Sequence, residues 1–217
     1  DSTKTLDVDG GTIKLDGNYP VGTQNVALGD GAADALTSGN YNVAVGHNAA
    51  GSLTSGSNSA MIGNAAGAAT TTGGANVAVG DIALTSNTTG ANNVAIGYAS
   101  LLLNTTASNN TAVGYQAAYS NQTGTQNTFL GIQSGYSNTT NYNTFLGAYT
   151  GYSNTTGIAN AVVGGPNTEN PTFYYNTTGS YNTVLGSGAL SANTTASSNT
   201  AVGYQAGYTA NQGPTYL

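Results

Sequence analysis

The chain has 217 residues, including 32 glycines, 8 acidic residues and 2 basic ones, and its formal net charge is -6. Both basic residues, Lys4 and Lys14, lie near the start, so the chain offers no basic patch and nucleic-acid binding is not expected. There is no apolar run of about eighteen residues to span a membrane, and the absence of cysteine excludes disulfides and thiolate chemistry.

Residues 1–22 differ in composition from everything that follows. Apolar and charged residues alternate around Gly10-Gly11, a pattern typical of a hairpin or of two short strands. Because an array of repeats follows, and its end units have unpaired strand edges, we expect this segment to cap the array. Asp7-Val8-Asp9-Gly10 resembles part of a calcium loop, but the later glutamate is missing, so no metal site is expected.

From residue 23 onward one short sequence recurs, represented by Asn110-Thr111-Ala112-Val113-Gly114. Its closing glycine, called position 0 below, recurs after 17 residues for six steps and then after 16, 17, 22 and 17 residues. The position-0 glycines are Gly29, Gly46, Gly63, Gly80, Gly97, Gly114, Gly131, Gly147, Gly164, Gly186 and Gly203. Eleven copies at this period predict a solenoid, in which each copy forms one rung of a stack.

The three residues before each glycine predict a β-strand. Position -1 is a branched aliphatic residue in every copy, as in Val113, and position -3 is Val, Thr or Ala. Because position -1 is never polar, we expect it to be buried inside the coil. Position -2 is mostly Ala but includes Phe129 and Phe145, and it then lies on the outer face. An apolar outer column indicates contact with further chains, most simply in a homotrimer; the alternative is that small residues there are tolerably exposed.

Position -4 is Asn in ten of the eleven copies, including Asn110. Stacked rungs place these amides about 4.8 Å apart, which predicts a ladder of side-chain hydrogen bonds. Asn also tolerates the left-handed backbone of a sharp corner. Gly114 and its equivalents are expected to need positive φ or a close approach. Each unit then contains a short second strand and ends in a turn rich in Ser, Thr, Asn and Gly.

Aromatic residues gather in the second half of the chain, where thirteen of the fifteen tyrosines and all three phenylalanines lie from Tyr98 onward. Tyr119, Tyr136 and Tyr152 occupy equivalent positions in consecutive units. This placement predicts an aromatic ladder that packs rungs together. The alternative is a stripe that contacts glycans, because tyrosine has a flat apolar body and a polar tip.

The unit between Gly164 and Gly186 is five residues longer than the others. Insertions in solenoid units form loops on one face, often the binding face, so we expect an insertion loop at 165–177. Its Phe173, Tyr174 and Tyr175 are the candidate receptor contacts, together with the three tyrosines named above. A tolerated surface bulge is the alternative.

Catalysis is not expected, because the single histidine, His47, has no partner residues. No acid–base pair, nucleophile signature or metal-ligand cluster accompanies it, and no cofactor is implied. Ice binding is an alternative, because threonines such as Thr88 and Thr105 form columns in the turns. The two threonines of each turn are adjacent, however, so on a flat strand they would point to opposite faces.

The repeat resembles a known family through segments 42–46, 93–98, 110–117 and 199–206, for example Asn-Val-Ala-Ile-Gly-Tyr at 93–98. These segments look like the head repeats of trimeric autotransporter adhesins and the related repeats of phage tail fibres, over residues 25–207. The resemblance implies a parallel β-roll with three chains about one axis, left-handed in the adhesins. The usual crossover rule would predict the other hand. The 17-residue period is longer than the adhesin unit and leaves the cross-section open. The opening residues are similar to virion structural proteins of marine cyanobacterial phages.

The sequence therefore predicts an all-β parallel β-solenoid of about eleven 17-residue rungs over residues 23–217, assembled as a homotrimer. The expected function is a structural and adhesive rod of a phage tail fibre or virion appendage, on a virion or another extracellular surface. Other virion proteins and a host cell-surface glycan or protein are the expected partners. The head domain of a bacterial trimeric adhesin is the alternative.

Overall fold

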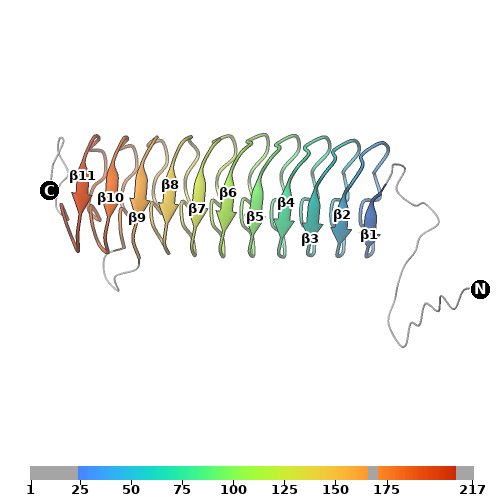
Figure 1. Ribbon diagram of the computed structural model, residues 1–217, viewed down its shortest axis with the longest axis horizontal. Helices are drawn as coiled ribbons and strands as arrows, with labels where there is room; N and C mark the ends of the chain where they lie inside the picture. Colours follow the sequence, from blue (N-terminus) through green and yellow to red (C-terminus); the bar gives the residue numbers. More distant parts are fainter. Residues whose placement is uncertain (1–23, 166–170, 209–217) are drawn as a thin grey trace, which may run out of the picture.

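The computed structural model describes residues 24–165 and 171–208. Within these residues eleven strands of three residues each form one parallel sheet, in sequential order from β1 to β11 (Figure 1). The strands are β1 (Val26–Leu28), β2 (Val43–Val45), β3 (Ala60–Ile62), β4 (Val77–Val79), β5 (Val94–Ile96), β6 (Thr111–Val113), β7 (Thr128–Leu130), β8 (Thr144–Leu146), β9 (Ala161–Val163), β10 (Thr183–Leu185) and β11 (Thr200–Val202). The predicted parallel β-solenoid is confirmed, and each described repeat contributes a single strand to it. The hairpin predicted for residues 1–22 lies outside the described residues.

Strand register follows the repeat, even where the unit changes length. Phe129 in β7 pairs with Phe145 in β8 across the 16-residue step, and Val162 in β9 pairs with Val184 in β10 across the 22-residue step. The short unit loses its residue in the polar turn, where the Asn127 amide donates to the carbonyl of Thr140 at 2.7 Å. Changes of unit length are therefore absorbed outside the sheet.

The inner and outer faces of the strand are the reverse of those predicted. Position -2 points into the coil, so that Phe129 and Phe145 are fully buried within a single chain. Position -1 lies on the outer surface, where Val113 is half-buried, Leu130 is 38% exposed and Val202 is 54% exposed. The predictions that Val113 is buried and that the two phenylalanines face other chains are wrong. Side chains alternate along the strand, so position -2 is the only one of its three residues that points into the coil.

Residues at positions -2 and +4 of the same rung line the interior, and in several rungs a large residue at one position accompanies a small one at the other. Ala95 faces Leu101, and both are fully buried. In the rung of Phe129, position +4 is Gly135, and a Cβ added there would lie 2.5 Å from the phenylalanine ring. The same exchange of large for small occurs in the pairs Met61 with Gly67 and Phe145 with Gly151. In these rungs the glycine makes room for the large side chain, whereas other rungs pair two small residues, such as Ala112 and Ala118, so the filled volume varies along the rod.

The predicted asparagine ladder is present but bonds mainly to backbone. The Asn110 side chain accepts the backbone N–H of Asn127 at 3.0 Å and donates to the carbonyl of Gly124 at 2.8 Å. A direct side-chain bond, from the Asn127 amide to Asn110 Oδ1 at 3.1 Å, joins the same two rungs. The left-handed residue at this corner is not the ladder asparagine but the residue before it, such as Asn109 with a φ of 63°.

A second buried asparagine ladder occupies position +7, within the turn that the sequence indicated only as polar. The Asn154 amide donates to Asn138 Oδ1 at 2.7 Å, and the Asn176 amide donates to Asn154 Oδ1 at 2.7 Å. These side chains are fully buried, so the turn closes the interior at the second corner.

The segment after each glycine is a series of turns instead of the predicted second strand. Its N–H groups still reach the next rung, as in the bond from Ala118 N to Ser134 O at 3.0 Å. The position-0 glycine fits its prediction: Gly97 has a φ of +125°, and a Cβ there would lie 2.6 Å from the carbonyl oxygen of Gly114. No helix in the described ranges has the length and hydropathy of a membrane span.

Candidate interaction surfaces

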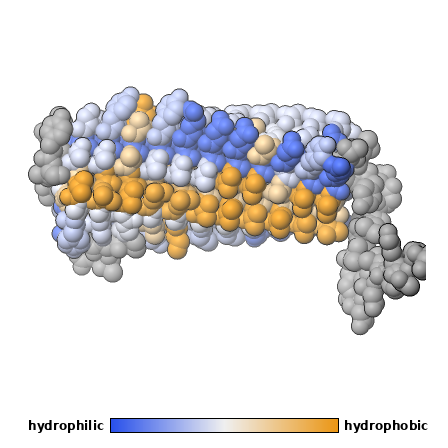
Figure 2. All heavy atoms as spheres, viewed as in Figure 1, coloured by the Kyte–Doolittle hydropathy of each residue, from blue (hydrophilic) through white to orange (hydrophobic). Residues whose placement is uncertain are grey.

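An apolar band covers the outer strand face from β1 to β11 (Figure 2). Its exposed members are Val26, Leu28, Ile62, Ile96, Leu130, Val163, Leu185 and Val202. Position -3, beside them, changes from Val in most of the first five strands to Thr in most of the later ones. Neither column carries a charged residue, and within the described part of the chain nothing packs over the band.

Four tyrosines form the predicted aromatic ladder. The rings of Tyr119, Tyr136, Tyr152 and Tyr174 stack with centroids 4.9, 5.0 and 4.9 Å apart and interplanar angles of 11°, 8° and 5°. Because each inner ring is covered on both faces by its neighbours, a sugar ring cannot lie flat on it. The ladder therefore joins rungs and presents only ring edges and hydroxyl tips to solvent.

Two phenols of the ladder, those of Tyr136 and Tyr174, have a raised pKa. Burial is the main cause that raises the pKa of Tyr136 above its ordinary value of 10.0, with further contributions from Tyr119, Tyr152 and Tyr115. Burial also raises the pKa of Tyr174, together with Tyr152, Tyr175 and Tyr149. The hydroxyl groups thus remain hydrogen-bond donors at physiological pH.

The aromatic residues predicted for the insertion loop do not share one surface. Phe173 is fully buried, with its ring centroid 6.2 Å from that of Phe145, so its predicted role as a receptor contact is wrong. Tyr174 belongs to the ladder. Tyr175 is 48% exposed and meets the Tyr174 ring at 77° with a centroid distance of 4.8 Å, so it alone can contact a partner with a large part of its ring.

The insertion is shorter than the predicted loop at 165–177. Thr172 Oγ1 donates to the carbonyl of Gly186 in the next rung at 2.9 Å. Phe173 N donates to Ala189 O at 3.1 Å, which is the rung-to-rung bond that Leu101 N makes to Ala117 O at 3.0 Å. Residues 172–177 therefore belong to the rung, and the added residues lie between Gly165 and Thr172. Residues 166–170 are outside the described ranges.

Three strongly exposed tyrosines lie at position -5, the corner before the strand, and sequence reasoning missed them. Tyr41 and Tyr142 are each 56% exposed, and Tyr181 is 60% exposed. All three have left-handed backbones, with φ between 59° and 65°. Their side chains make no hydrogen bond or ring contact with the described residues. Alignment of the units at their glycines would have shown that the three share one column.

A polar column follows the glycine in the first rungs. His47 Nδ1 donates to Asn64 Oδ1 at 3.0 Å, because the Asn64 amide nitrogen itself donates to Asp81 Oδ1 at 2.8 Å. Nowhere in the described part of the chain do three His, Cys, Asp or Glu side chains come together as metal ligands would. The column forms rung-to-rung hydrogen bonds.

One threonine column of the turns also bonds from rung to rung. Thr88 Oγ1 donates to the carbonyl of Thr105 at 3.0 Å, and Thr105 Oγ1 donates to the carbonyl of Gln122 at 3.1 Å. The hydroxyl protons of this column are therefore used within the solenoid and are not available to organise external water.

Comparison with known proteins finds no matching family model, no similar curated protein and no similar solved structure.

Proposed function

We propose that this protein is a structural and adhesive rod of a phage tail fibre or comparable virion appendage, built from three copies of the chain. The apolar strand face is the observation that carries the proposal. Monomeric proteins rarely expose a continuous apolar patch as long as this band, which runs from β1 to β11. Its burial would stabilise an assembly, because apolar area removed from water contributes about 25 cal/mol per Å². Packing of the three bands about a common axis covers positions -1 and -3 in every rung.

The number of chains rests on the resemblance of the repeat to trimeric fibre and adhesin repeats, because a flat apolar face by itself also suits a dimer. The face is uncharged and every strand is in register, so neighbouring chains can pack at each rung. In this arrangement the burial of Phe129 and Phe145 inside each coil is consistent with a trimer, since the strand residues on either side of them form the contact.

The rod serves as a stiff spacer. Eleven rungs at about 4.8 Å extend roughly 50 Å, and the sheet runs along this whole length. The two buried asparagine ladders and the tyrosine ladder join further rungs over parts of it. Host-surface contact falls to exposed aromatic side chains. Tyr175 and the hydroxyl tips of Tyr119, Tyr136 and Tyr152 suit this role, whereas Phe173 does not.

The test is the mass of the native particle by native mass spectrometry or light scattering. The wild-type protein is expected at three times the 21.4 kDa chain mass. A Val79→Lys, Ile96→Lys double variant places charges on the strand face and is expected to give monomers. Thr106→Lys, on the exposed turn, is the matched control and should keep the trimer. A wild-type monomer would contradict the proposal, and a trimer that survives both lysines would show that another surface forms the interface.

The head domain of a bacterial trimeric adhesin is the second candidate, since the same strand face favours it. Antibody labelling of phage particles and of bacterial surfaces distinguishes the two locations. The ice-binding alternative gains no support from the column of Thr88 and Thr105, because these hydroxyl groups donate their protons within the solenoid.

A further inference from the structure

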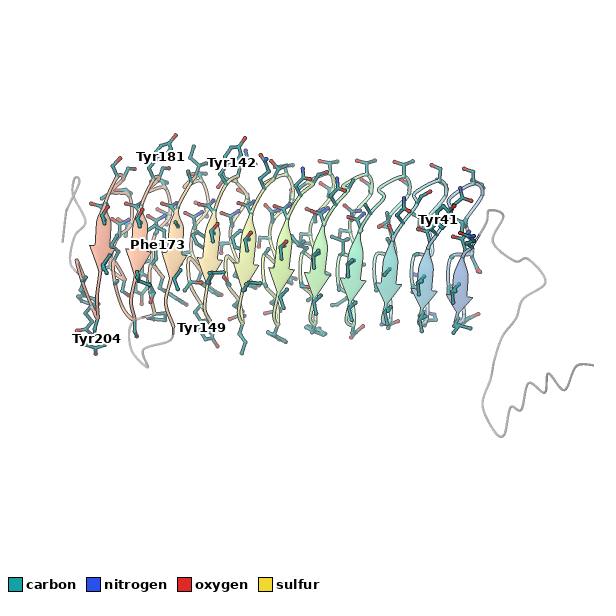
Figure 3. The ribbon with its side chains drawn as sticks, in the orientation of Figure 1. Tyr41, Tyr142, Tyr149, Phe173, Tyr181 and Tyr204 are labelled. Carbon is teal, nitrogen blue, oxygen red and sulfur yellow. The ribbon has the colours of Figure 1, made fainter. Side chains whose placement is uncertain are left out.

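We infer that Tyr142 and Tyr181 form the two walls of a carbohydrate site that takes one neutral pyranose ring. The inference rests on the proposed contact with a host glycan, but it places that contact at position -5 and away from the insertion. Figure 3 shows both side chains projecting from the same edge of the rod. Both residues are more than half exposed, and neither side chain makes a hydrogen bond or a ring contact with the described residues.

Tyr142 and Tyr181 lie two rungs apart, and Ala159 occupies the same position in the rung between them. Tyr142 N donates to Thr125 O at 3.1 Å, Ala159 N to Asn141 O at 3.4 Å, and Tyr181 N to Ile158 O at 3.0 Å. All three position -5 residues are left-handed, so their side chains leave the rod in the same direction. Ala159 has only a methyl group, and it forms the floor of a notch between the two rings.

The width of the notch suits a puckered ring. Two rung steps separate the Cα atoms of Tyr142 and Tyr181 by about 9.6 Å. A flat ring in van der Waals contact with both walls would need only about 7–8 Å, at 3.5–4.0 Å for each contact. A pyranose chair is thicker than an aromatic ring, so it fills the wider gap without requiring both tyrosines to lean inward.

The chemistry of the walls selects the kind of sugar. Each tyrosine offers an apolar ring face, and a pyranose with all its substituents equatorial has axial C–H groups on both faces. An axial hydroxyl would place a polar group against one wall. The phenolic hydroxyls at the tips can hydrogen-bond the equatorial hydroxyls of the sugar. The described residues include no lysine or arginine that would favour an acidic sugar. A neutral sugar of the glucose configuration is therefore the expected ligand.

The experiment is saturation-transfer NMR on the full chain, with methyl β-glucopyranoside and methyl β-galactopyranoside as probes. The glucoside is expected to bind, with transfer strongest to its axial C–H protons, and the galactoside to bind more weakly because its 4-hydroxyl is axial. Tyr142→Ala and Tyr181→Ala should each weaken glucoside binding about tenfold or more, a factor that corresponds to about 1.4 kcal/mol.

Two further variants make the test specific. Tyr41→Ala is the matched control, because Tyr41 is as exposed as Tyr142 and occupies the same column, but the residue two rungs later is Ala75. It should leave binding unchanged. Ala159→Tyr fills the notch with a third ring at a position where tyrosine tolerates the left-handed backbone, and it should abolish binding while the rod stays folded. Circular dichroism checks the fold of each variant.

The inference is overturned if the wild-type protein binds neither probe, if the galactoside binds as well as the glucoside, or if Ala159→Tyr leaves binding intact. Its failure is separable from that of the proposed rod. If the protein is a trimer that binds no sugar, only the carbohydrate site is contradicted. If it is a monomer whose sugar binding depends on the notch, only the trimeric rod is contradicted.

Discussion

Residues other than glycine with positive φ recur at fixed places in each rung. In one rung these are Ala75 at position -5, Ile82 at +2 and Leu84 at +4, with φ of 55°, 49° and 54°. Each left-handed residue costs about 1–2 kcal/mol relative to the ordinary backbone. Rung-to-rung bonds hold these conformations, for example Leu84 N to Ser100 O at 2.9 Å. The stack therefore imposes a backbone that no single rung would keep.

Replacement of Ala75 by glycine should stabilise the protein. Its side chain is exposed, so little burial is lost, and glycine relieves the left-handed conformation, although it also loosens the unfolded chain. We expect a gain of about 0.5 kcal/mol in the free energy of unfolding, measured by urea denaturation. Ala148→Gly is the control, because Ala148 is half-exposed without positive φ, and it should destabilise. Equal effects at the two sites would contradict the explanation.

At Gly97 the reverse substitution should be strongly destabilising. An alanine there would combine an unfavourable φ of +125° with a Cβ 2.6 Å from the carbonyl oxygen of Gly114. We expect a loss of more than about 2 kcal/mol, seen as a lower urea midpoint. Gly165→Ala is the matched control, since a Cβ at Gly165 would meet nothing within 4 Å. A small effect at Gly97 would mean that rungs separate easily at this corner.

Within a rung, the strand and the segment opposite it act as one packing unit. Replacement of Phe129 by alanine should lower the free energy of unfolding by about 3–5 kcal/mol, because a cavity opens in the interior. Gly135→Ala should also destabilise, because the added methyl meets the phenylalanine ring. The double variant reproduces the pair Ala112 and Ala118, which packs in the preceding rung. The double variant should therefore lose less free energy of unfolding than the two single variants together, by at least about 1 kcal/mol. A double-mutant cycle measured by chemical denaturation tests this. Simple additivity would contradict the pairing.

The tyrosine ladder should make the protein less stable in alkali. The folded-state pKa of Tyr136 lies above its unfolded value near 10, so between the two values the folded state binds more protons. The free energy of unfolding should therefore fall as pH rises above about 10. Thermal unfolding followed across this range should show a shallower fall for Tyr136→Phe. The same slope in both proteins would show that the ladder does not cause the effect.

The strand and the repeat period could be predicted from the sequence, because the position-0 glycines and the aliphatic position -1 recur in every copy. It could not identify the inner face. Val113 and Ala112 are both apolar, so alternation left no polar side to mark the solvent. It also misplaced Phe173, because no repeated glycine lies between residues 165 and 177 to show where the rung resumes. The position -5 tyrosines escaped notice because Tyr142 and Tyr181 are separated by a unit that has Ala159 in their place.

At the scale of the whole molecule, each unit is a complete length of rod. Deletion of residues 98–114 joins Gly97 to Tyr115 and removes one rung while it keeps every column in phase. We expect the shortened chain to retain its β-sheet circular dichroism spectrum and the oligomeric state of the wild-type protein in native mass spectrometry. Deletion of residues 98–105 removes about half a rung and should abolish the fold, because the columns no longer match. Survival of the second variant would show that register is not fixed by the repeat.

The sequential strand order also bears on how the chain is made. Each strand pairs only with the strands of the units before and after it, so no contact in the sheet waits for a distant part of the chain. A finished rung is a template for the next one, and the coil can lengthen during synthesis as a one-dimensional crystal does. Three chains growing side by side would have to advance in step. A copy with one unit too few would leave its partners with an uncovered apolar rung, so the assembly would itself select chains of equal length.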